Sequence, residues 1–163
     1  MERILLINGI SPYIYYAIIR VAQENEWAIP YNKCLTAFLI QLLITIIISV
    51  ICRDKKRLAK ITMINKLIQI PYYILFFVFS VAIVLLGIPL MGFGLILWPI
   101  LVAVDVGVFL STLIPEEICT IKLRMNGNIS IGRFILYFIC NAIYVLDIVF
   151  SVLIKREYDA SEN

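Results

Sequence analysis

Two aspartates lie within long apolar segments of this chain. Asp105 lies in LILWPILVAVDVGVFLSTLI, and Asp147 lies in FILYFICNAIYVLDIVFSVLI. A charged side chain at the centre of a bilayer costs about 3 kcal/mol or more, so intramembrane acids are rare and often mark ion or proton pathways. We expect no lysine or arginine within the spans, so each aspartate must be protonated, bind a cation or face water.

The polar side chains of residues 134–154 fall on one helical stripe. These are Tyr137, Cys140, Asn141, Tyr144, Asp147 and Ser151. Counted from the cytoplasmic end at 1.5 Å per residue, Asp105 lies about 14 Å deep and Tyr144 about 15 Å deep. Asn141 or Tyr144 is therefore placed to donate a hydrogen bond to Asp105. We predict that the ion- or proton-binding residues are Asp105, Asp147, Asn141, Tyr144 and Gln41.

The same polar residues also have a structural interpretation. Polar side chains in membrane helices often join helices, each contact contributing about 1 kcal/mol. A separate face, on residues 95–114, carries the small residues Ala103, Gly107 and Ser111 at intervals of four. This spacing permits close helix packing, against a helix of the same chain or of another copy.

The composition indicates a membrane protein. The chain has 163 residues, of which 63% are hydrophobic and 15% charged, and its mean hydropathy is +1.00. A soluble domain is about half apolar and about a quarter charged. A span needs about 20 apolar residues. We predict one all-α membrane domain, residues 1–163, with spans at about 34–52, 67–86, 95–114 and 134–154.

Residues 1–33 permit two interpretations. Ser11-Pro12 is typical of a helix start, and apolar residues then recur at helical spacing. We favour an amphipathic helix lying in the membrane interface. The alternative is a fifth span over residues 4–19, which is short and contains Asn8 and Pro12.

Basic residues predict the orientation. The run that follows the first predicted span, and the loop before the last one, are the most basic parts of the chain. The positive-inside rule places both loops in the cytoplasm and both termini outside, in the inner membrane of a bacterium, although Lys155 and Arg156 then lie on the less basic side. The residues expected to contact lipid headgroups are Arg53, Lys55, Lys56, Arg57 and Lys60.

Residues 115–133 alternate apolar and polar side chains around Asn126-Gly127. Asn-Gly between alternating runs is a strong hairpin signal, so we predict a small cytoplasmic β-hairpin that pairs 118–125 with 128–132. Glu116 and Glu117 follow Pro115 at an expected helix start, where acidic residues complement the helix dipole.

One segment resembles a known family. KLRMNGNISIGRFILYFICNAIYVLD is similar to the hairpin-then-helix segment of RDD-type membrane proteins, in which a strand, a turn with glycine and a Ser/Gly/Arg run precede a span. The first predicted span lacks the Arg and Asp pattern of that family. No function is carried over from the resemblance.

The motifs searched for catalysis are missing from the sequence. It contains no HExxH, GxSxG or GxxxxGK, no histidine, and no cysteine pair at metal-ligand spacing. We expect no enzyme, cofactor, metal or nucleic-acid partner. The predicted function is an oligomeric ion- or proton-linked channel or transport protein. The alternative is a non-transporting accessory, immunity-type or sensor subunit that docks on a larger membrane partner.

Overall fold

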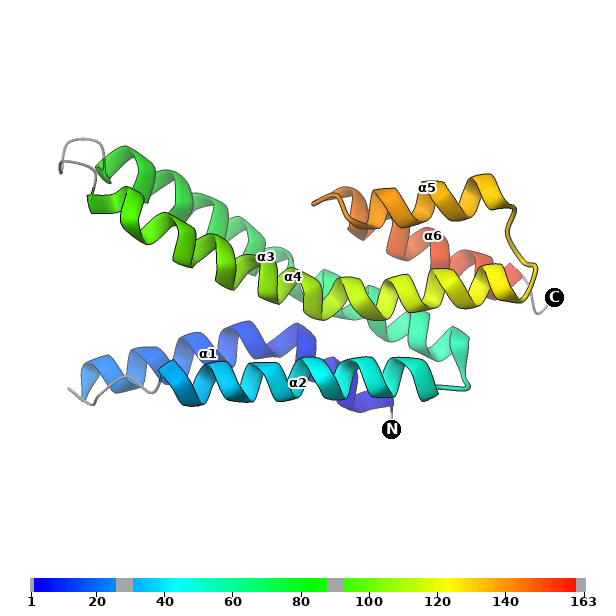
Figure 1. The fold of residues 1–163 in the computed structure, drawn as a ribbon, viewed down its shortest axis with the longest axis horizontal. Helices are drawn as coiled ribbons and strands as arrows, with labels where there is room; N and C mark the ends of the chain where they lie inside the picture. The colour runs from blue at the N-terminus through cyan, green and yellow to red at the C-terminus, as the bar shows by residue number, and fades with distance from the viewer. Residues whose placement is uncertain (1, 26–30, 88–92, 161–163) are drawn as a thin grey trace.

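The computed structural model describes residues 2–25, 31–87 and 93–160. This part of the chain is helical apart from short turns, and it contains no strand. A 3₁₀ helix is followed by six α-helices, which pack side by side along the long axis of the molecule (Figure 1). They are η1 (Glu2–Leu6), α1 (Ile7–Glu24), α2 (Tyr31–Ile51), α3 (Lys55–Gly87), α4 (Phe93–Met125), α5 (Ile131–Asn141) and α6 (Leu146–Ala160).

The count of four spans is not supported. Within the described residues, three helical segments are long and apolar enough to cross a membrane. They are Arg3–Glu24, Asn32–Ile51 and Lys55–Leu85. The second and third cover the predicted spans 34–52 and 67–86 except for the last residue of each, whereas 95–114 falls in α4, which is not among these three.

The N-terminal segment meets the criteria for a span, which was the alternative interpretation. In its first half the polar residues face the protein: Asn8 and Ser11 are buried, while Ile10 and Ile14 are exposed. A helix lying at an interface would turn its polar side to water. The exposed apolar side of α1 is instead suited to contact lipid.

The predicted β-hairpin is wrong. Residues 118–125 continue α4, and residue 131 already begins α5, so no strand pairs across the turn. A hairpin would bury Ile121, Leu123 and Met125 on one face, but Ile121 and Met125 are exposed. The buried residues are Cys119 and Leu123, which recur at the helical interval of four. Packing against the rest of the protein therefore favours the helical pattern over the alternating pattern of a strand.

Asn126-Gly127 ends a helix instead of turning a hairpin. Gly127 has a φ of 76°, the left-handed conformation that glycine adopts without steric cost. Its amide donates to the Arg124 carbonyl at 3.0 Å, and the Asn128 amide donates to the Leu123 carbonyl at 3.2 Å. This pair of bonds is the Schellman motif, which satisfies the last carbonyls of α4.

The predicted fourth span, 134–154, is broken in its middle. α5 ends at Asn141 and α6 begins at Leu146, and the two pack against each other as a helical hairpin. With 11 and 15 residues, neither helix is long enough to cross a bilayer alone. Val145 in the connection has a φ of 74°, a strained value for a β-branched residue.

The α5–α6 hairpin returns to the end of the bundle from which it starts (Figure 1). Lys56 at the start of α3 forms an ion pair with Asp159 near the end of α6, at 3.3 Å. A hydrogen bond from Lys155 holds the pKa of Asp159 below its usual range. Residues 52–54, residues 126–130 and the end of α6 therefore lie together, and we call this region the basic end of the bundle.

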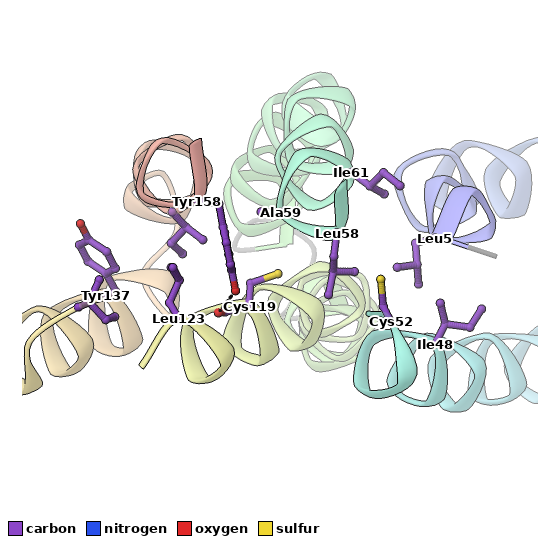
Figure 2. Close-up of a cluster of buried hydrophobic side chains, with 12 residues drawn as sticks. Leu5, Ile48, Cys52, Leu58, Ala59, Ile61, Cys119, Leu123, Tyr137 and Tyr158 are labelled. Carbon is purple, nitrogen blue, oxygen red and sulfur yellow. Dashed lines mark hydrogen bonds between the residues drawn. The ribbon is translucent and has the colours of Figure 1, made fainter. Parts of the chain in front are cut away.

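A hydrophobic core lies near the basic end. Leu58 of α3 and Leu123 of α4 are fully buried in it, together with Leu5 from the N-terminal segment (Figure 2). The Tyr158 hydroxyl of α6 donates to the Cys119 carbonyl of α4 at 2.8 Å, which ties the hairpin to this core (Figure 2). The core thus fixes η1, α2, α3, α4 and α6 relative to one another.

Lys122 caps the C-terminal end of α2. The Lys122 ammonium on α4 donates to the carbonyls of Ser49, Val50 and Cys52 at 2.6, 3.1 and 2.9 Å. The last carbonyls of a helix have no partner within the helix, and a cation there also complements the helix dipole. This contact fixes α2 against α4.

Candidate functional site

Three charged side chains meet in the interior, between α3, α4 and α6. The Lys66 ammonium contacts Glu116 Oε2 and lies 3.0 Å from Asp147 Oδ2. The lysine side chain is 0% exposed, and each carboxylate side chain is 1% exposed. We call Lys66, Glu116 and Asp147 the buried ionic cluster.

The cluster is unbalanced in charge. One ammonium faces two carboxylates, so full ionisation leaves one net negative charge in a region withdrawn from solvent. An ion pair offsets much of the cost of burying its own two charges, but an extra unpaired charge stays costly. The fully ionised cluster therefore carries an energetic cost that a further positive charge would offset.

Acceptor oxygens without donors surround the same point. Asp147 accepts no hydrogen bond from any described residue, although its Oδ2 contacts the Lys66 ammonium as an ion pair. The buried oxygens Glu116 Oε1, Glu117 Oε2 and Asn141 Oδ1 also lack a donor among the described residues. Most buried polar atoms in proteins are hydrogen-bonded, so this group of acceptors needs an explanation.

Each member of the cluster occupies a different local position in its helix. Lys66 follows the buried Thr62 by one helical turn on α3. Glu116 directly follows Pro115 inside α4, so the helix continues where the sequence suggested a start. Asp147 lies in the first turn of α6, where the helix dipole favours a negative charge.

The second aspartate has a different partner. Tyr144, in the connection between α5 and α6, donates its hydroxyl to Asp105 Oδ2, as the depth count predicted. Its ring stacks on Phe109 with centroids 4.4 Å apart and meets Tyr73 edge-on at 5.5 Å. Tyr144 thus attaches the tip of the hairpin to α3 and α4.

The other two predicted candidates have hydrogen-bond partners other than the two aspartates. Asn141 donates to Thr120 Oγ1 at 3.2 Å and also interacts with Glu117. Gln41 donates to Asn8 Oδ1 at 2.8 Å and to Ser11 Oγ at 2.9 Å. The five predicted residues therefore do not form one constellation.

Gln41 belongs to a neutral network that joins the N-terminal helices. Asn8 Nδ2 donates to Thr45 Oγ1 at 2.9 Å and to the Ser111 carbonyl at 3.2 Å. Gln69 of α3 donates to the Asn8 carbonyl at 2.9 Å, and its own Oε1 accepts from Tyr73 at 2.8 Å. Because these groups are neutral and mutually bonded, the network serves as a joint between helices.

The small-residue face of α4 packs partly within the chain. A Cβ added at Gly107 would lie 3.2 Å from the Phe38 ring of α2, and Ser111 is 1% exposed. Ala103 is exposed. Gly107 and Ser111 thus pack against other parts of this chain, whereas Ala103 does not.

The predicted lipid-contacting residues lie at the basic end, and several of them also hold the fold together. Arg53, Arg57 and Lys60 are exposed. Lys55 donates to Asn126 Oδ1 at 2.6 Å, and Lys56 pairs with Asp159.

Lys66 and Glu116 were missed because both were assigned to loops. A signal was nevertheless present in the sequence. On α3, Lys66 lies three residues before Gln69 and therefore on the same polar face. On α4, Glu116 lies four residues after Thr112 and therefore on the same face as that residue. A count of helical phase beyond the apolar segments would have placed this lysine opposite the acidic residues.

Comparisons with known proteins identify no relative. No protein-family model, curated protein or solved structure matches the chain. The residues that resemble RDD-type proteins form the end of α4, a helix cap, α5 and the connection to α6, so the strand implied by that resemblance is missing among the described residues.

Proposed function

We propose that this protein is a small membrane transport protein linked to an ion or proton gradient, with the buried ionic cluster as its responsive site. The observation that carries the proposal is the unequal charge of the cluster, in which Lys66 faces two carboxylates out of contact with solvent. A site of this kind changes charge when it gains or loses one cation. Charged residues within membrane segments are costly, and they are commonly retained for ion or proton movement.

The broken helix beside the cluster supports the same proposal. Many transporters hold their ion sites with helices interrupted near the middle of the membrane, where a half-helix N-terminus faces a charged group. Here α6 begins one residue before Asp147, and the preceding Val145 is strained. Irregular backbone at membrane depth is tolerated where protein or water covers it.

We also propose an orientation. The α5–α6 hairpin brings Lys155 and Arg156 to the basic end, so these residues join the two basic loops instead of opposing them. Arg3 lies near the same end, because the neighbouring Leu5 packs in its core. Arg20 and Lys33 remain near the opposite end. The positive-inside rule then places the basic end, with the end of α6, in the cytoplasm of the cell membrane.

Flux through liposomes tests the proposed transport. Purified protein in liposomes should carry ions or protons down an imposed gradient, and Asp147→Asn should reduce the rate at least tenfold. Asp159→Asn is the matched control, because this aspartate lies near the end of the same helix with a side chain that is 36% exposed. Equal flux in wild type, both variants and empty liposomes would overturn the proposal.

A specific observation favours the second candidate, an accessory subunit that does not transport. Asp105 is bonded to Tyr144, and the Asn8 network satisfies its own members, so much of the intramembrane polarity acts as a joint. On this alternative, Asp147→Asn leaves flux at the background level of empty liposomes but weakens the binding of a defined membrane partner.

A further inference from the structure

We infer that the ion to which the buried ionic cluster responds is a proton, held jointly by Glu116 and Asp147, with Lys66 as the fixed counter-charge. This inference rests on the proposed function and names its ion. Two carboxylates that compete for one ammonium form a coupled pair, so the proton belongs to the pair instead of to either residue.

The charge count gives the number of protons. With Lys66 charged and both carboxylates ionised, the cluster carries one net negative charge. Transfer of one proton from hydronium to a carboxylate oxygen leaves water and makes the cluster neutral. Removal of that proton restores the charge. The two states differ by a single O–H bond, and the lysine ammonium is unchanged between them.

The same geometry disfavours a metal cation. The Lys66 ammonium already contacts both carboxylates, and a second cation between them would be repelled by it. The described residues contain no group of three or more His, Cys, Asp or Glu side chains placed to hold a metal ion. A proton avoids this conflict because it becomes part of a carboxyl group.

The groups around the cluster favour proton uptake. α3 contributes Tyr73 in addition to Lys66, and α4 contributes Glu117 and Cys119 beside Glu116. Asn141 of α5 is neutral. The third carboxylate, Glu117, adds negative charge nearby whenever it is ionised, which favours the protonated form of the cluster.

The acceptor oxygens that lack donors agree with this assignment. A protonated carboxyl is a donor as well as an acceptor, so one proton on Asp147 or Glu116 can be shared with a neighbouring oxygen. Both residues carry at least one oxygen that accepts no hydrogen bond from the described residues. The proton that balances the charge of the cluster therefore also provides a hydrogen-bond donor for these oxygens.

Infrared difference spectroscopy of the purified full-length protein tests the inference. As the pH is raised, the wild type should lose the carbonyl band of one buried protonated carboxyl group. In Asp147→Asn or Glu116→Gln, the remaining carboxylate pairs with Lys66, so the band should be lost at neutral pH. In Lys66→Met the band should be about twice as strong, since both carboxyl groups need a proton. The exposed control Asp159→Asn should keep the wild-type band.

The outcomes separate this inference from the proposed transport. A band that behaves as described, in a protein that carries no flux, supports the proton site and overturns transport. Flux driven by a sodium gradient without a titrating band overturns the proton site and leaves transport standing. A band unchanged in both Asp147→Asn and Glu116→Gln also overturns the inference. If one of these variants fails to fold, the other variant and Lys66→Met still test the inference.

Discussion

The ammonium of Lys66 lies 3.0 Å from Asp147, although the two residues belong to different helices and neither side chain is more than 1% exposed. This contact joins the long helix α3 to the short helix α6. With Glu116 it forms a buried ionic cluster that ties three helices together.

Tyr144→Phe should lower the free energy of unfolding by about 1 kcal/mol, because it removes a hydrogen bond and keeps the stacked ring. Asp105→Ala combined with Tyr144→Phe should cost less than the sum of the two single changes, since both remove the same bond. Reversible unfolding in mixed micelles measures these values. The matched control is Tyr72→Phe on α3, whose hydroxyl takes part in none of the hydrogen bonds found among the described residues. Additive losses would show that Tyr144 does not donate to Asp105.

Gly127→Ala should destabilise the protein by about 1 kcal/mol, since alanine resists the left-handed conformation that closes α4. Gly132→Ala is a matched control within α5. A Cβ meets nothing within 4 Å at either glycine, but only Gly127 has a positive φ. The control change should be neutral or slightly stabilising. Equal effects in thermal unfolding would argue against the helix cap.

The orientation can be tested by cysteine labelling in intact cells. None of the four native cysteines forms a disulfide, so they are first replaced. With Ala160→Cys, a membrane-impermeant maleimide should react only after lysis, because the end of α6 lies at the basic end. Asn25→Cys, exposed at the other end of α1, should react in intact cells. Labelling of Ala160→Cys before lysis would place the end of α6 outside and contradict the proposed orientation.

Part of this structure could be predicted from the sequence alone. Hydropathy identified α2 almost to its ends, because that helix is apolar throughout. Counting residues along a helix predicted that Asn141 or Tyr144 donates to Asp105, and Tyr144 does so. The count holds because α5 runs unbroken from residue 131 to residue 141, three residues before Tyr144.

The remaining features depend on contacts between distant parts of the chain. No proline or glycine marks the break at residues 142–145, so the local sequence gives no reason for two helices there. Asn126-Gly127 suits a hairpin and a helix cap equally well. Burial of Cys119 together with exposure of Ile121 and Met125 decides for the helix. Lys66 was placed outside the membrane because it adjoins a basic run, although α3 continues unbroken through it.

The central claim is that Lys66 neutralises buried carboxylate charge, and one comparison tests it most directly. Lys66→Met should lower the free energy of unfolding at neutral pH by about 3 to 5 kcal/mol, because it leaves Glu116 and Asp147 buried without their cation. Adding Glu116→Gln and Asp147→Asn should restore most of that loss. Lys60→Met, at an exposed position of the same helix, should change it by no more than about 0.5 kcal/mol. If Lys66→Met is no more costly than Lys60→Met, or if the added changes restore nothing, the cluster does not exist as described.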